Sequence, residues 1–213
     1  MTRLDILYHD RHIVAVHKPA GLLVHKSEIA RGQDDTFAMQ MVRDQVGQYV
    51  YTLHRIDRPT SGVLLFALDE PSARTLKQNF TDQLIEKAYL AIVRGWPPKK
   101  MTIDYPLKPA DYGKKFRRKK TKRSPKESKP AVTHFEQLGR VMVQSAVGRY
   151  ETARYALLHI TPKTGRTHQI RRHLAHLRHP IVGDKRYGDR HHNRFFTEIL
   201  GLSGLFLLAR SIS

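Results

Sequence analysis

Short apolar runs, each bounded by polar residues or by glycine and proline, recur along the whole chain. Runs of about four to eight residues with such boundaries are typical of strands. We expect strands at 5–8, 12–17, 50–53, 62–68, 87–94, 131–138, 141–146, 155–161 and 205–209. We expect helices at about 36–46, 71–84, 167–177 and 193–200. Strands dominate and the helices are scattered between them, which predicts an α+β fold with a mixed, mainly antiparallel central sheet and flanking helices.

The length of 213 residues suits a single domain, and 40% hydrophobic residues suffice for its core. The chain has no cysteine, which excludes disulfides, thiolate metal sites and a cysteine nucleophile. Charged residues interrupt the N-terminal segment, and no stretch approaches the roughly 18 apolar residues of a membrane span. We therefore expect a soluble, cytoplasmic protein with no membrane association.

The charge is strongly positive, with 38 Lys and Arg against 19 Asp and Glu, or +19. Residues 111–130 hold ten basic and two acidic residues, and the other 193 residues still hold 28 basic and 17 acidic ones. The composition of 111–130 favours a disordered loop. A field of this sign attracts polyanions. Nucleic acid is therefore the first expected partner, and a membrane surface is the second, although no basic amphipathic helix supports it.

The densest group of reactive side chains lies at 54–62, between two apolar runs. Asp57 stands there between Arg55 and Arg58, which would keep its carboxylate ionised. An ionised carboxylate can act as a nucleophile or a base. A turn with an ordinary surface ion pair is the alternative, because such pairs are common and weak.

A second basic group lies at 162–174, at a predicted turn and helix start. Its cations are Lys163, Arg166, Arg171 and Arg172. Cations at the start of a helix suit phosphate, so a helix that faces RNA is one interpretation. A solvated basic helix is the other.

Metal and nucleotide chemistry have weaker support. His168, His173, His176 and His179 lack the one-face spacing of zinc-binding helices, so we expect no metal site. The sequence contains neither of the glycine-rich phosphate loops. Tyr89, within residues 87–89 of a predicted strand, is by itself compatible with simple packing.

Four separated motifs occur together in one order, and together they resemble the RluA-type family of pseudouridine synthases. Residues 54–62 are similar to that family's HRLD-R-x-T-S-G motif, with Ile56 in place of leucine. Residues 87–89 match K-x-Y, residues 165–171 match G-R-T-H-Q-I-R, and residues 18–22 match an early K-P-x-G segment. The resemblance runs from about residue 4 to 210 and is interrupted by the basic loop.

The resemblance implies the pseudouridine synthase catalytic fold and an isomerase that needs no cofactor. It implies that Asp57 is the catalytic carboxylate, that Arg171 is its partner, and that Tyr89 stacks on the flipped uracil. It further implies that Arg55 fills the space that the base leaves, and that His54 is structural. The expected uracil pocket comprises Ile170 and Leu174. The expected RNA-binding residues are Arg55, Arg58, Lys163, Arg166, Arg172, Lys114, Arg117 and Arg118.

Residues 179–184 and 188–194 are similar to the branch called tRNA pseudouridine synthase C. This similarity implies a tRNA substrate with uridine 65 as the target, rRNA being the second candidate, and we expect a monomer. Relatives usually continue past the strand matched by 205–209, so a truncated C-terminus with an exposed sheet edge is a further expectation. Two other functions stay open: a non-catalytic RNA-binding or assembly protein that keeps the fold, and a metal-dependent nuclease.

Overall fold

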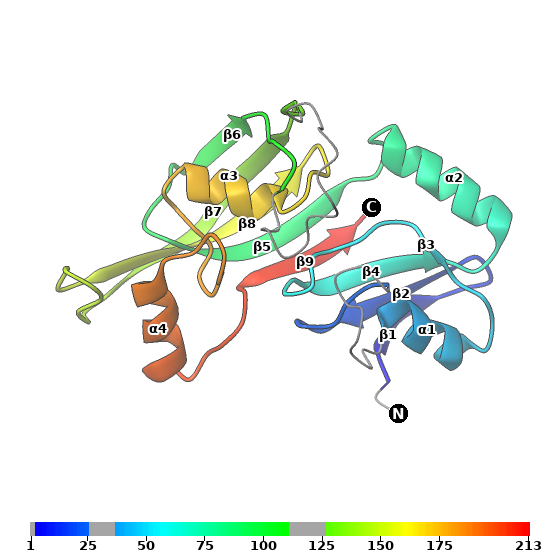
Figure 1. Ribbon diagram of the computed structural model, residues 1–213, viewed down its shortest axis with the longest axis horizontal. Coiled ribbons are helices and arrows are strands. Elements are labelled where there is room, and N and C mark those ends of the chain that lie inside the picture. The colour runs from blue at the N-terminus through cyan, green and yellow to red at the C-terminus, as the bar shows by residue number, and fades with distance from the viewer. Residues whose placement is uncertain (1–2, 26–36, 111–126) are drawn as a thin grey trace, which may run out of the picture.

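The computed structural model describes residues 3–25, 37–110 and 127–213, and in these ranges it has nine strands and four helices (Figure 1). The fold is α+β with a mixed, mainly antiparallel sheet, as the sequence predicted. The strands are β1 (Asp5–His9), β2 (Ile13–Lys18), β3 (Tyr51–Thr52), β4 (Ser61–Ala67), β5 (Lys87–Arg94), β6 (Lys100–Asp104), β7 (Val132–Val143), β8 (Ala153–Pro162) and β9 (Leu207–Ile212). The helices are α1 (Ala38–Val46), α2 (Glu70–Thr81), α3 (Gln169–His176) and α4 (Arg190–Glu198).

The sheet joins two halves of the chain through its last strand. The strand order is β1-β2-β4-β9-β5-β8-β7-β6, with β3 paired to β4. β9 runs parallel to β4 and antiparallel to β5, so it lies in the interior of the sheet (Figure 1). Gly62 has φ 114° and faces β9, where a Cβ atom would lie 2.1 Å from the carbonyl oxygen of Ala209. Glycine is therefore required for β4 to approach β9 directly after the Asp57 loop.

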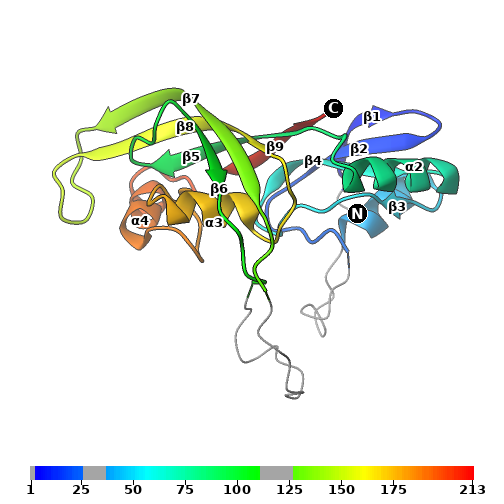
Figure 2. The same cartoon turned by 90° about the horizontal axis from the view of Figure 1, so that it is seen from above.

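Each half has its own apolar core. In the first half, Val14 of β2 and Phe66 of β4 are fully buried against Val42 of α1. In the second half, Leu174 of α3 packs in one cluster with Ile160 of β8. Figure 2 shows α3 and α4 near the β5–β8 half and α1 and α2 near the other, so the β4–β9–β5 junction lies between the two halves.

Two of the four helices, α2 and α4, begin at an aspartate whose side chain caps the helix. Asp69 caps α2 by accepting the N–H of Ser72, as expected for an N-cap carboxylate. Asp189 caps α4, which begins three residues before the predicted start at 193. α1 begins after Phe37, which makes no side-chain cap, and Thr36 lies outside the described residues.

Two strand predictions need correction. Residues 131–138 and 141–146 were predicted as separate strands, but they belong to one strand, β7. A bulge between Gln137 and Gly139 shifts the register by one residue, and the pairing with β8 continues on both sides of it. β6 was not predicted. It is an edge strand that pairs with β7, and only Ile103 among its residues is buried. Its residues alternate between polar and apolar, with Met101 and Ile103 as the apolar positions, but this pattern is only five residues long and follows two prolines.

Candidate active site

A cavity of about 490 Å³ opens where the two halves meet. Its walls come from the β3–β4 loop, the end of α2, β5, and the turn and first residues of α3. It contains most of the side chains singled out from the sequence. These lining residues are Arg55, Asp57, Tyr89, Lys163, Arg166, Ile170 and Arg171.

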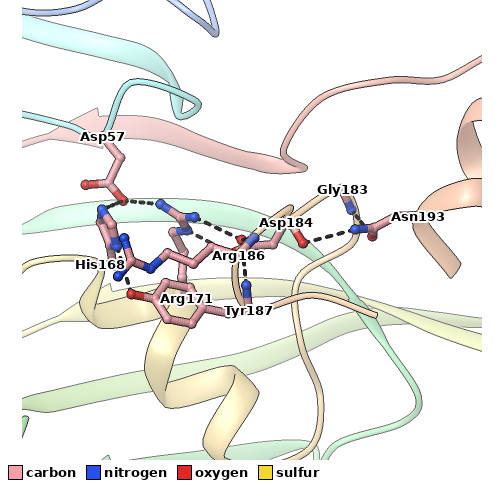
Figure 3. Close-up of polar contacts among 8 residues, drawn as sticks. All are labelled: Asp57, His168, Arg171, Gly183, Asp184, Arg186, Tyr187 and Asn193. Carbon is pink, nitrogen blue, oxygen red and sulfur yellow. Dashed lines mark hydrogen bonds and ion pairs between the residues drawn. The ribbon is translucent and has the colours of Figure 1, made fainter. Parts of the chain in front are cut away.

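Asp57 lies in the loop before β4, and its side chain is 25% exposed. Its Oδ2 atom accepts a hydrogen bond from Nη1 of Arg171 at 3.0 Å, and Nε2 of His168 lies 3.9 Å from the same oxygen (Figure 3). In Figure 3 the second carboxylate oxygen points away from Arg171, and no dashed line reaches it from the residues drawn. Oδ2 is thus held in place by Arg171, while the other oxygen is directed away from that guanidinium.

Arg171 connects Asp57 to a second carboxylate. Its side chain is 6% exposed, and its Nε and Nη2 atoms donate to the two oxygens of Asp184 at 2.7 and 2.9 Å. Such bidentate pairing fixes the plane of the guanidinium. Burial by itself raises the pKa of Asp184. The Arg171 guanidinium and the backbone N–H groups of the following turn lower it by more, so the pKa of Asp184 lies below its ordinary value. Asp184 is therefore ionised and aims Arg171 at Asp57.

His168 and Tyr187 complete the arrangement around Arg171. His168 is the N-cap of α3 in a left-handed conformation, φ 54°, and its Nδ1 lies 3.0 Å from the Tyr187 hydroxyl. The Arg171 guanidinium lies 5.2 Å from the centre of the Tyr187 ring. Arg171 is thus enclosed by two carboxylates and an aromatic face, which leaves it little rotational freedom.

The loop that carries Asp57 is tied to the first half by a buried lysine. Lys18 is fully buried, and its ammonium donates to the carbonyls of Pro19, Leu22 and Arg58 at 2.8, 2.8 and 3.2 Å. Arg58 in turn donates through Nε to the carbonyl of Gly21, whose N–H donates back to the Arg58 carbonyl. Burial lowers the pKa of Lys18 to about 8, so it is still mostly protonated at neutral pH. The residues next to Asp57 are therefore held by the K-P-x-G segment.

Tyr89 reaches the cavity from β5. Burial, followed by the nearby Asp57 charge, raises the pKa of its hydroxyl to about 12, so the phenol is protonated at neutral pH. His54 also lines the cavity, and contacts within the first half of the molecule hold its ring. Its Nε2 accepts the N–H of Leu65 at 3.1 Å, its ring stacks on Phe80, and burial lowers its pKa to about 4.

Three predicted site residues lie elsewhere. Leu174 is fully buried in the core beneath α3 and is not among the residues that line the cavity. Arg58 and Arg172 are also absent from the lining. Three more, Lys114, Arg117 and Arg118, lie outside the described residues.

The roles of Lys18 and Asp184 were missed. Both belong to segments that the sequence analysis singled out, but neither carried an assignment. A lysine followed by proline and a lone aspartate give no local sign of burial, so their contacts became visible only in the fold.

The four histidines of the second basic group point to different partners. His173 is buried between Thr133 and the carbonyl of Tyr105, and His176 stacks on the Tyr105 ring. His179 contacts the carbonyl of Arg94. In the part of the chain that the structure describes, three or more metal-ligating side chains do not gather anywhere, and the helices of that part are too short or too polar to cross a membrane.

The fold and this ion-paired cavity define the class: the chain belongs to the RNA pseudouridylate synthase family, whose model matches residues 12–176. Members of this family are isomerases, and the resemblance to RluA-type enzymes is confirmed.

Among individual proteins, tRNA pseudouridine synthase C of Yersinia pestis is 52% identical over 206 residues, which cover 97% of this chain and 79% of the relative. The protein of the same name from Haemophilus ducreyi is 49% identical over 209 residues, with 97% and 83% covered. The solved structure of human RNA pseudouridylate synthase domain containing 4 is 26% identical, with a TM-score of 0.68 over 98% of this chain and 83% of that one. Human RNA pseudouridylate synthase domain containing 1 shares the fold, with a TM-score of 0.74 and 23% identity over 99% of this chain and 78% of that one.

Proposed function

We propose that this chain converts a specific uridine of tRNA to pseudouridine, and that the target is uridine 65. The relatives named tRNA pseudouridine synthase C support the choice of tRNA over rRNA, because they are about half identical over nearly the whole chain. The net charge of +19 suits a large polyanion. The observation that carries the proposal is the chain of contacts Asp57–Arg171–Asp184 in a cavity that also holds Tyr89.

The reaction breaks the N1–C1′ bond of uridine and forms a C5–C1′ bond after the uracil turns. Overall, C5 loses its proton and N1 gains one, so no oxidant, reductant or metal is needed. Asp57 is the catalytic carboxylate that starts this exchange. Arg171 orients it through one oxygen, which leaves the other oxygen for the substrate.

The target uridine must leave its stack to enter the cavity. Tyr89 stacks on the flipped uracil, with its hydroxyl near C5 for the late proton transfer. Because the hydroxyl is protonated at neutral pH, it passes its own proton on as it accepts the one from C5. Ile170 provides an apolar part of the wall. Arg55, exposed at the cavity, fills the place that the base vacates.

The cations around the cavity hold the RNA backbone. Lys163 and Arg166 are exposed and line the cavity, and Arg172 follows on α3. Arg166 also donates to the carbonyl of Pro130 at 3.0 Å, so the described end of the basic segment 111–130 lies beside the cavity. We propose that the cations of that segment contact RNA next to the target. The enzyme acts as a cytoplasmic monomer.

Incubation of the protein with transcribed tRNA in EDTA, followed by pseudouridine mapping, tests this function. We expect pseudouridine at position 65 and at no other uridine. Binding without product would favour a non-catalytic RNA-binding protein, and strand cleavage that EDTA abolishes would favour a nuclease. Product at another position would retain the activity and reject the target. Comparison of tRNA and rRNA from cells with and without the gene identifies the natural RNA.

A further inference from the structure

Two arginines lie over one tryptophan at a distance from the cavity. Trp96 follows β5 by two residues, and the guanidinium carbons of Arg140 on β7 and Arg154 on β8 each lie 4.7 Å from the centre of its indole. The indole N–H donates to the carbonyl of Val141 at 3.2 Å, which fixes the ring against β7. Three segments thus build one arrangement, which we call the Arg–Trp–Arg site (Trp96, Arg140 and Arg154).

The two guanidiniums keep their charge and their donors. Both arginines are exposed, and among the described residues neither side chain forms an ion pair or a hydrogen bond. Arg94, on the neighbouring strand, contrasts with them because it is paired with Asp189. An aromatic face holds a guanidinium in place without neutralising it. Five N–H donors on each arginine therefore stay available to an anion.

The Arg–Trp–Arg site and the cavity share one face of the sheet. Side chains alternate along a strand, so Arg154 and Ile160 of β8 point to the same face. Arg140 shares that face because it pairs with Ala156, and Tyr89 shares it because it pairs with Ile160. α3 packs on this face, where Leu174 is in one cluster with Ile160, whereas α4 packs on the opposite face against Tyr155.

The distance between the two sites suits one RNA molecule. Six residues of extended strand separate Arg154 from the position beside Tyr89, or about 20 Å at roughly 3.3 Å per residue. Phosphates recur every few ångströms along an RNA backbone, so an RNA with its uridine in the cavity can present others here. Figure 2 shows the end of the β7–β8 hairpin extending past α3 and α4.

We propose that the Arg–Trp–Arg site is a second anchor that binds the phosphodiester backbone of the RNA substrate. This proposal rests on the proposed function. Guanidiniums match phosphate oxygens through paired N–H groups, and the indole restricts both side chains before RNA arrives. Less side-chain freedom is then lost on binding, which favours affinity. The site contributes nothing to bond breaking, since it lies far from Asp57.

The test uses the double variant R140Q/R154Q and the control R74Q/R194Q. The control removes the same two charges, but from arginines already paired with Glu70 and Glu198 on their own helices. The Kd for full-length tRNA is measured against salt, and the single-turnover rate is measured at saturating tRNA. We expect R140Q/R154Q to raise Kd roughly tenfold at 0.1 M salt and to lower the log–log salt slope by about two. Its saturating rate and the behaviour of the control should match the unmodified protein.

Three outcomes would overturn the anchor: an unchanged Kd and slope, an equal loss in both double variants, or a fall in saturating rate at unchanged Kd. W96F, which keeps an aromatic face, should lie between the unmodified protein and R140Q/R154Q. The binding readout is independent of product, so a protein that binds tRNA but makes no pseudouridine would reject the proposed function and still test the anchor.

Discussion

Arg171 and the Arg140–Arg154 pair show two opposite ways to hold an arginine. Arg171 is almost fully buried and donates to two carboxylates, so its charge is neutralised inside the protein. Arg140 and Arg154 are exposed and held by an indole, so their charge faces outward. The first arrangement fixes the orientation of the guanidinium. The second leaves two unneutralised positive charges at the surface, where they can attract a polyanion.

This difference suggests that catalysis and RNA affinity depend on different parts of the molecule. Chemistry requires an oriented carboxylate, and a buried ion-pair network supplies it at the junction of the two halves. Affinity for RNA requires uncompensated cations, and these are spread over the surface. We therefore expect variants of the buried network to change rate, and variants of exposed cations to change affinity and its salt dependence.

The largest effect is expected from Asp57→Asn, which keeps the shape of the side chain but removes its charge and nucleophilicity. Pseudouridine formation should fall below detection, while the Kd for tRNA should stay within a few fold. Product mapping and filter binding measure the two quantities. Substantial pseudouridine from this variant would remove Asp57 from the mechanism.

Asp184→Asn should give the next largest effect, because Arg171 loses the ionised partner that fixes its plane. A hydrogen bond to a charged group contributes about 1.5–3 kcal/mol, so the saturating rate should fall roughly ten- to a hundredfold at unchanged Kd. Asp189→Asn is the matched control, because it breaks the pairing with Arg94 outside the cavity. Equal rates for both variants would place Asp184 outside the active site.

Tyr89 separates stacking from proton transfer. Tyr89→Phe should bind tRNA normally yet slow the late step about tenfold or more, an effect typical of losing an acid–base group. Tyr89→Leu should also weaken capture of the base, since stacking contributes about 1–3 kcal/mol. If Tyr89→Phe reacts at the original rate in single turnover, the hydroxyl has no role and the ring alone matters.

The smallest effect concerns stability rather than turnover. His54 has a folded pKa of about 4, below its ordinary 6.5, so the unfolded chain binds more protons between these values. The free energy of unfolding should therefore fall as the pH drops from 6.5 to 4, by up to about 3 kcal/mol from this residue. His54→Gln, which can still accept the Leu65 N–H, lacks this contribution, and urea titrations across that range measure it. Parallel pH curves for both proteins would contradict the assignment.

The sequence located the proposed reacting groups but not the residues that hold them in place. Asp57, Tyr89 and Arg171 lie in local motifs, and the predicted strands and helix place them correctly. Asp184 depends on a turn thirteen residues after Arg171, and Lys18 depends on a contact across forty residues to Arg58. Such partners require the packed fold, because no local pattern encodes them.

The Arg–Trp–Arg site could not be predicted from the sequence for the same reason. It depends on the register of β7 against β8, and the bulge at Gln137 shifts that register by one residue. A prediction that broke β7 into two strands could not place Arg140 beside Trp96. The basic segment, in contrast, is evident from composition, but composition alone does not give its position.

The division between rate and affinity is tested most directly by one titration: single-turnover pseudouridine formation against tRNA concentration for Asp57→Asn and for R140Q/R154Q, with Kd measured in parallel. We expect Asp57→Asn to bind tRNA normally and make no product. We expect R140Q/R154Q to need roughly tenfold more tRNA yet reach the original rate at saturation. Product from Asp57→Asn, or a loss of both rate and affinity in each variant, would contradict the account.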